Sequence, residues 1–527
     1  MGSLQRGLCL VGGSVGRLRP RPGGLRRARR RPGLQVRRVR LGRPGGCWRL
    51  ALCLLIALTP ACRGGPVPAP GAPLAGISDA VPPASPGRPD LVLLVSVSGL
   101  TPDLYLEDPT PMPILAALAR AGVAAEHVES VVPATAYPVH TTLVTGRTPN
   151  DHGIPADRML GDHGVRRERY SHASYVRGAT LWQSAIEARI GVAALDWPAT
   201  LGAAIPLLLP DVLPTRRGER WIDLLAEATT PWLLTLARSR PEELAASGAP
   251  GAPRDALLVD LACHVVAAEP PPGLVLLRLS QTGPVLSARG SDSEQARGAF
   301  ARVDADLGDL LGCLDEAGSL ARAAIVVAGD GAVLPVHTAV RANSVLAEAG
   351  LLTLGPSGAV EGWSALVRSN GGSAFVYARE DHFAVAARSA LEAEAKRSGA
   401  FRIVSAQEMI RRDADSEAWF GLEARPGFAF EDPAAGPLLQ PSRRRSAGGY
   451  LESRPDLSPG FVAYGRGVRR GLRIPEIAQL DVAPTIAELR GLELQGARGS
   501  AFVGVLDLRA DLGPADTAGG RTEGDLE

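Results

Sequence analysis

Three continuous apolar runs constrain the fold of this 527-residue chain more than any other feature. Each run ends on a polar residue: Leu91 to Ser98 (LVLLVSVS), Leu274 to Ser280 (LVLLRLS) and Ala323 to Asp330 (AAIVVAGD). Apolar runs of this length are typical of strands that are buried on both faces of a parallel sheet. Segments with helical spacing follow the runs, at residues 113–122, 299–318 and 342–350. The alternation predicts an α/β fold, a doubly wound and mostly parallel sheet with helices on both faces.

The polar residues that end the runs mark the edge of the sheet where function is expected. Parallel strands present their carboxyl ends at one edge, where crevices form, and Ser98, Ser280 and Asp330 all fall there. Residues 363–440 show shorter strand-like segments around one helical segment, which predicts an inserted α+β subdomain. We therefore predict one domain over residues 89–512, followed by a polar tail at 513–527.

The charge of the chain is divided between a leader and a body. Residues 1–49 hold 14 arginines and no acidic residue, so 43 basic and 55 acidic side chains remain beyond them. The body is therefore acidic, although the whole chain has a formal charge of +2. It carries no basic stripe, which argues against nucleic acid as a partner.

The segment after the leader predicts export. Residues 50–62 contain an apolar run shorter than the roughly 20 residues that span a bilayer, and a basic segment precedes it. The ending Thr-Pro-Ala-Cys62 is similar to a bacterial lipobox, which makes Cys62 a candidate lipidation site. Residues 63–88, rich in Pro, Ala and Gly, predict a tether. The expected locations are the periplasm or outer membrane as a lipoprotein, or the medium as a secreted protein; a start within residues 1–49 stays open.

Two cysteines, Cys263 and Cys313, lie in the body on predicted helices. Their spacing matches neither a metal site nor the framework of a small disulfide-rich domain. We expect two buried thiols.

Two motifs near the first strand carry a family resemblance. VSVSGLTPDLY (Val95 to Tyr105) and VVPATAYPVHTTLVTGRTPNDHGI (Val131 to Ile154) resemble the type I phosphodiesterase/nucleotide pyrophosphatase branch of the alkaline phosphatase superfamily. Similar segments continue in family order to about residue 500. The resemblance implies an alkaline-phosphatase-like fold and hydrolysis of phosphoric diesters by two zinc-type ions and a threonine nucleophile. Two cations can stabilise both the attacking and the leaving oxygen of an in-line displacement.

Most of that catalytic equipment is replaced in this chain. The resemblance places the nucleophilic threonine at Ala136, whose methyl group cannot attack phosphorus. Of six metal-ligand positions only Asp330 keeps a ligand, and the others are Ser98, Ser280, Pro284, Gly331 and Gly448. An asparagine that helps to hold phosphate corresponds to Asp157, whose negative charge would repel an anion. Because one carboxylate cannot balance two divalent ions, we expect no tightly bound cofactor, and two zinc-type ions only if the family site persists.

Simpler interpretations apply to the remaining candidates. Asp330 can be a strand-end carboxylate that caps the next turn. His140, His152 and His337 occupy positions that support loops in the family. The run Arg443-Arg444-Arg445 is typical of a solvated loop, and an anion site near Gly448 is the alternative.

These observations favour a pseudoenzyme. Its expected role is to bind an anionic ligand, a glycan or a protein in the cell envelope, with contact to the membrane through a lipid anchor at most. One alternative is an active hydrolase with a site rearranged around Asp330, Asp157 and the weak substitute nucleophile Thr135. A second alternative is a structural lipoprotein without a ligand.

Overall fold

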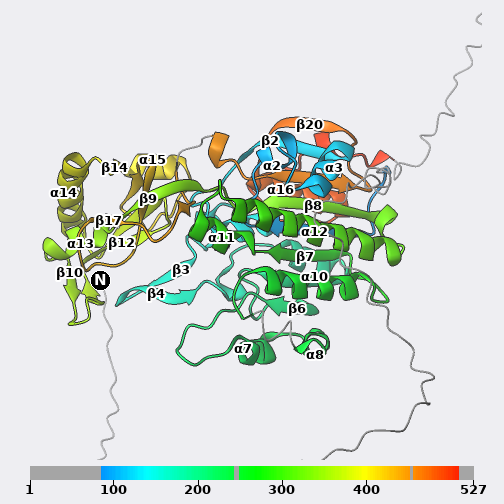
Figure 1. Cartoon of the computed structure of the whole chain (residues 1–527), viewed down its shortest axis with the longest axis horizontal. Coiled ribbons are helices and arrows are strands. Elements are labelled where there is room, and N and C mark those ends of the chain that lie inside the picture. Colours follow the sequence, from blue (N-terminus) through cyan, green and yellow to red (C-terminus); the bar gives the residue numbers. More distant parts are fainter. Residues whose placement is uncertain (1–84, 242–247, 452–454, 510–527) are drawn as a thin grey trace, which may run out of the picture. The chain divides into compact units, whose positions relative to one another are not determined.

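The computed structural model describes residues 85–241, 248–451 and 455–509 (Figure 1). The predicted leader, the export segment with Cys62, residues 63–84 of the tether and the polar tail lie outside the described residues. Their predicted roles therefore stay predictions. No helix in the described part of the chain is both long and apolar enough to cross a membrane.

An eight-stranded sheet lies at the centre of the fold (Figure 1). Its strand order is β20-β2-β19-β8-β1-β7-β5-β6, and every neighbouring pair is parallel except the two pairs that involve β19. The three apolar runs of the sequence form β1, β8 and β7, which are adjacent and buried at every residue. The strands are β1 (Leu91–Val97), β2 (Val123–Glu129), β5 (Val192–Trp197), β6 (Leu207–Pro210), β7 (Leu274–Leu279), β8 (Ala323–Gly329), β19 (Phe461–Gly465) and β20 (Leu472–Ala478).

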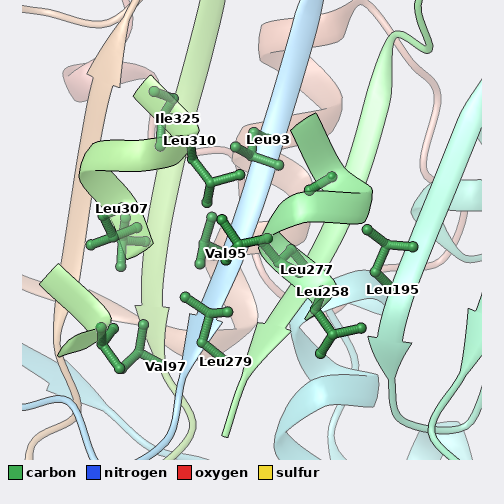
Figure 2. Packing of buried hydrophobic residues seen from close by; sticks show 14 of the residues in the cluster. Leu93, Val95, Val97, Leu195, Leu258, Leu277, Leu279, Leu307, Leu310 and Ile325 are labelled. Carbon is green, nitrogen blue, oxygen red and sulfur yellow. The ribbon is translucent and has the colours of Figure 1, made fainter. Parts of the chain in front are cut away.

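Helices cover both faces of this sheet, because the side chains of each strand alternate between two apolar clusters. Leu93 and Val95 of β1 face Leu310 of α12 (Figure 2), while Leu94 belongs to the opposite cluster. Burial of each such side chain stabilises the fold by about 1.5–3 kcal/mol. The first face carries α2 (Asp103–Leu106), α3 (Pro113–Ala121), α7 (Trp221–Ala228), α8 (Pro231–Arg238), α10 (Ala252–Val266), α11 (Thr282–Arg289) and α12 (Glu294–Glu316), and the second carries α4 (Ala136–Thr145), α6 (Leu181–Glu187) and α16 (Gln479–Arg490). The predicted fold class is confirmed.

A second, antiparallel sheet forms the core of the inserted α+β part. Its order is β12-β13-β15-β14, and α13 and α14 pack on it. Its elements are β12 (Ala365–Ser369), β13 (Ser373–Ala378), α14 (Asp381–Ser398), β14 (Phe401–Val404), α15 (Ala406–Arg411) and β15 (Phe420–Ala424). The remaining elements are α5 (Pro149–His152), β3 (Arg158–Gly161), β4 (Gly164–Arg169), β9 (Leu334–Val340), α13 (Ala342–Glu348), β10 (Leu352–Leu354), β11 (Val360–Trp363), β16 (Gly427–Phe430), β17 (Leu439–Pro441) and β18 (Ser446–Ala447).

The expectation of two buried thiols is wrong. Cys263 of α10 and Cys313 of α12 form a disulfide, with their Cα atoms 5.3 Å apart. The two helices pack against each other on the same face of the sheet (Figure 1), which brings together residues that are 50 positions apart in sequence. Sequence spacing could not reveal the pair, because the pairing depends on how the helices dock.

Replacing both Cys263 and Cys313 with serine should lower the free energy of unfolding by about 2–4 kcal/mol, since the cross-link restricts the unfolded chain. Denaturant titration of both proteins measures the difference. Reductant should destabilise the unmodified protein to a similar degree and leave the variant unchanged. Recovery of the two cysteines on separate peptides after digestion without reductant would contradict the disulfide.

Candidate functional site

The ends of β1 and β8 hold the surviving acidic residue in a hydrogen-bonded pair. The parallel register pairs Val97 with Gly329, so the next residues, Ser98 and Asp330, lie side by side. The Ser98 hydroxyl donates to Asp330 Oδ2 at 2.8 Å, and the Gly99 N–H donates to Oδ1 at 3.0 Å. Both carboxylate oxygens therefore already accept a hydrogen bond from the protein. Asp330 thus accepts a hydrogen bond from the turn after the neighbouring strand β1, and not from the turn after its own strand that the simpler interpretation expected.

The end of β7 lies next to the same pair but adds no strong metal ligand. The Thr282 hydroxyl donates to the Ser98 carbonyl, and a Cβ atom built on Gly283 would lie 3.6 Å from the Ser98 Cβ atom. Ser280 is buried, and its hydroxyl has no hydrogen-bond partner among the described residues. Pro284 lies in the first turn of α11 and has no side-chain ligand atom. Neutral hydroxyls are poor ligands for zinc compared with carboxylate or imidazole.

Backbone atoms lie close to the two family ligand positions that are occupied by glycine, Gly331 and Gly448. Gly331 has φ +143°, and a Cβ atom built there would lie 3.2 Å from the Ala134 carbonyl oxygen. At Gly448 the equivalent atom would lie 2.8 Å from the Ala332 carbonyl oxygen. Because these neighbours are main-chain atoms, a histidine at either position would require the backbone to shift.

Three residues of the predicted site, Thr135, Ala136 and Asp157, meet at the N-terminus of α4. Ala136 is the first residue of the helix and Thr135 is its N-cap, with a buried hydroxyl that has no partner among the described residues. Asp157 Oδ1 accepts a hydrogen bond from the Tyr137 N–H at 2.9 Å. A carboxylate of the chain itself thus occupies the positive end of the helix dipole, where an anion would otherwise be favoured.

The residues at the six ligand positions do not fit two divalent cations. Across residues 85–241, 248–451 and 455–509 there is no group of three or more His, Cys, Asp or Glu side chains that could hold a metal ion. A stable zinc site needs about four strong donors, and only Asp330 supplies one here.

A buried network of charges lies beneath the pair, and the sequence analysis missed it. Arg278 of β7 donates to Asp211 Oδ2 at 3.0 Å, and Arg254 pairs with Asp196 at 3.3 Å. Burial raises the pKa of Asp330, and the Arg278 charge opposes that rise. Arg278 thus supplies positive charge close to a carboxylate that has no metal partner. The signal that could have revealed it is an arginine inside the apolar run LVLLRLS.

The histidines near the site have structural contacts. Burial lowers the pKa of both His140 and His152 to about 3, so both are neutral at physiological pH. His140 Nδ1 donates to the Ala136 carbonyl at 2.7 Å, and His152 lies within hydrogen-bond distance of Thr142. His337 is exposed on β9.

A cavity of about 770 Å³ opens beside the N-terminus of α4. Thr135 and Asp157 line one part of it, and six arginines contribute to its walls: Arg158, Arg166, Arg167, Arg169, Arg368 and Arg444. Of the arginine run predicted as a solvated loop, Arg444 lines this cavity, although all three side chains of the run are exposed. The structure therefore places Thr135, Ala136 and Asp157 together beside a polar cavity.

Comparisons with known proteins agree with this architecture. A family model described as type I phosphodiesterase / nucleotide pyrophosphatase matches residues 92–439. The chain is 24% identical over 174 residues to ectonucleotide pyrophosphatase/phosphodiesterase family member 3 from Mus musculus, covering 30% of this chain and 20% of that protein. A rat family member 1 matches at 22% identity over 135 residues, covering 25% of this chain and 15% of its own length. The matched regions thus span a fifth or less of these relatives.

Solved structures show a similar fold over most of the chain. Human ectonucleotide pyrophosphatase/phosphodiesterase 5 has a TM-score of 0.57 and 17% identity, covering 79% of this chain and all of the solved one. The murine protein of the same name, in an inactive threonine-to-alanine variant in complex with AMP, has a TM-score of 0.57 and 18% identity, covering 80% of this chain and all of its own. At this identity the similarity concerns the fold.

Replacing Ser98 with alanine should lower the free energy of unfolding by about 1–2 kcal/mol, because the mostly enclosed Asp330 carboxylate loses a hydrogen-bond donor. Ser280→Ala is the matched control: it removes a buried hydroxyl without a partner and should change stability by no more than about 0.5 kcal/mol. Denaturant titration of the two variants measures the difference. Equal losses in both would show that the hydrogen bond from Ser98 contributes nothing.

Proposed function

Since the chain belongs to the type I phosphodiesterase / nucleotide pyrophosphatase family, we propose that it is a non-hydrolysing member, a pseudoenzyme that binds an anionic ligand and does not cleave it. The observation that carries the proposal is the hydrogen bond from the Ser98 hydroxyl to Asp330. A carboxylate at both positions would need a cation between the two charges. A hydroxyl beside a carboxylate forms a stable pair without one.

The other replacements support the same conclusion. Two divalent ions would bring four positive charges to a single carboxylate, and such a charge balance disfavours tight binding of both. Ala136 offers no nucleophile, and the Asp157 carboxylate occupies the end of α4 toward which a phosphate would be drawn. The resemblance thus places the replaced ligands, the replaced nucleophile and the replaced phosphate-binding residue at one edge of a regular sheet, in which β1 pairs with β7 and β8 in parallel.

A solved relative suggests that binding can persist without catalysis. The murine structure is of a variant that is inactive after one threonine is changed to alanine, and it is in complex with AMP. The resemblance places alanine at the nucleophile position of this chain naturally, at Ala136. We therefore expect that this chain can also bind an anionic ligand without cleaving it. A glycan or a protein of the cell envelope is the other class of partner that we propose.

We further propose that the protein is exported. Disulfides persist in oxidising compartments such as the bacterial periplasm, and the link between Cys263 and Cys313 is consistent with export. The signal-like segment and Cys62 would supply a lipid anchor, or the signal alone would lead to secretion. Intact mass spectrometry of the mature protein distinguishes these two routes.

The alternative of a rearranged hydrolase rests on Thr135, whose buried hydroxyl lines the cavity without a partner. It requires Asp157 or Asp330 to act as a base, yet each of these carboxylates already accepts a backbone N–H. The alternative of a structural lipoprotein requires that the cavity binds no small molecule. The experiments below separate both alternatives from the proposal.

The full chain, dialysed against micromolar zinc, should retain well under one zinc ion per chain, because no strong ligand set is present. It should also hydrolyse bis(p-nitrophenyl) phosphate no faster than buffer. Plasma mass spectrometry and absorbance at 400–410 nm measure these two quantities. About two ions per chain, or turnover that Asp330→Ala abolishes, would refute the pseudoenzyme.

A variant that restores Ser98→Asp, Ser280→Asp and Ala136→Thr tests how far the site has diverged. We expect it to bind at most one ion and to remain inactive, because Pro284, Gly331 and Gly448 still supply no side-chain ligand at three of the six family positions. Strong diesterase activity of this triple variant would show that the loss of catalysis depends on these three side chains alone.

A further inference from the structure

Two parts of the chain supply more than half of the residues that line the 770 Å³ cavity. The hairpin of β3 and β4 forms one wall, and β12 with residues 430–434 forms another. The hairpin is held in place at its turn, where the Trp363 indole N–H donates to the Gly161 carbonyl at 2.8 Å and His163 Nδ1 lies 2.8 Å from the Glu361 carbonyl oxygen. These two contacts tie the hairpin to β11, whose Val360 also lines the cavity, so this side of the cavity is a fixed part of the fold.

Positive charge exceeds negative charge in this cavity. Its lining includes the six arginines named above and three carboxylates, those of Asp157, Glu431 and Asp432. Each carboxylate is engaged by the protein: Asp157 by the Tyr137 N–H, Asp432 by the Ser369 N–H at 2.8 Å, and Glu431 by Arg341 at 3.6 Å. Six arginines against three carboxylates leave the lining with an excess of positive charge, although Asp432 interacts electrostatically with Arg158 and Arg444.

Four of the arginines take no part in the ion pairs of the described residues. Among the described ion pairs, none involves Arg158, Arg166, Arg167 or Arg444. Three of them come from the hairpin, and Arg444 comes from the segment before β18. Guanidinium groups on different walls can each bind a phosphate or sulfate with two parallel hydrogen bonds. The lining thus suits a ligand that carries more than one anionic group.

A buried donor without a partner adds a second, independent observation. Asn370 lines the cavity and is 8% exposed, yet its Nδ2 atom has no hydrogen-bond partner among the described residues. Neighbouring Arg368 is 2% exposed, and Asp415 holds it at 2.9 Å. Leaving a buried amide donor unsatisfied costs about 1–3 kcal/mol, which an acceptor on a ligand would recover.

The lining offers little for a nucleobase. Phe430 is the one Phe, Tyr or Trp residue among the lining residues, and it is buried against Phe401 with ring centroids 5.7 Å apart. Bases that are bound without hydrogen-bond specificity stack on exposed aromatic rings, with a contribution from arginine, and His163 is the one exposed aromatic ring among the lining residues. A ligand recognised here is therefore selected by its anionic groups.

We infer that this cavity binds a small organic polyanion, a molecule with two or more phosphate or sulfate groups, without a metal ion and without recognition of a nucleobase. The inference rests on the proposed function, since it assigns the ligand class of a protein that does not hydrolyse its ligand. Phosphate and sulfate share the tetrahedral oxyanion that arginine recognises, and the choice between them is made by experiment.

The test is calorimetric titration of the full chain in buffer with EDTA. The probes are myo-inositol hexakisphosphate and sucrose octasulfate, and binding of either supports the inference and identifies the phosphate or the sulfate source. Inorganic tripolyphosphate and ATP should bind with affinities within about threefold of each other, because the base adds nothing. Failure of both polyanions to bind, or ATP binding about tenfold tighter than tripolyphosphate, would overturn the inference.

Variants of equal charge separate the cavity from general attraction to a charged surface. Arg166→Ala with Arg444→Ala should weaken binding at least about tenfold, whereas Arg120→Ala with Arg289→Ala, both exposed and outside the lining, should weaken it less than about twofold. Asn370→Asp should weaken binding with little change in melting temperature. Equal losses in the two double variants would overturn the inference.

The two proposals fail in different ways. Absence of polyanion binding in a protein that also takes up no zinc would overturn the ligand class and leave the pseudoenzyme standing. Zinc uptake with hydrolysis would overturn the pseudoenzyme, whatever the polyanion titrations show.

Discussion

The hydrogen bond from the Ser98 hydroxyl to Asp330 is the interaction on which the account of this site depends. It joins the ends of two adjacent parallel strands, β1 and β8, at the edge where sheets of this kind place their chemistry. With both of its oxygens engaged by Ser98 and Gly99, Asp330 needs no cation to be satisfied. Arg278 adds a fixed positive charge below it. Hydrogen bonds from the protein and the charge of Arg278 thus stabilise the Asp330 carboxylate, which metal ions would stabilise in a metalloenzyme.

The fold was accessible from the sequence because its signals are local. An apolar run such as Leu91 to Val97 has one stable use in a chain of this size, as a strand covered on both faces, and its position before Ser98 fixes which residue reaches the edge of the sheet. The runs also placed Ser98 and Asp330 at one edge of the sheet, but that β1 and β8 are neighbours in this register comes from the structure. The replaced family positions could be read directly from their motifs.

The rest of the site depends on docking between segments far apart in sequence. The disulfide of Cys263 with Cys313 forms because α10 and α12 pack closely enough to bring the two Cα atoms within 5.3 Å. The spacing of the cysteines in the sequence does not determine how the two helices pack. The arginine cavity requires the β3–β4 hairpin to stand opposite β12, which brings Arg158 near Asn370 although more than 200 residues separate them. In the sequence, single arginines in a loop or an edge hairpin are typical of a solvated surface. Only the folded structure shows that these arginines line the same cavity.

Asp330 accepts a hydrogen bond from Ser98, and we propose that it binds no metal ion. Crystals grown or soaked with zinc, with diffraction data collected on both sides of the zinc absorption edge, test it most directly. We expect no anomalous peak within bonding distance of Asp330 and a distance near 2.8 Å between Ser98 Oγ and Asp330 Oδ2. A zinc peak bonded to Asp330, with Ser98 turned away, would contradict the account.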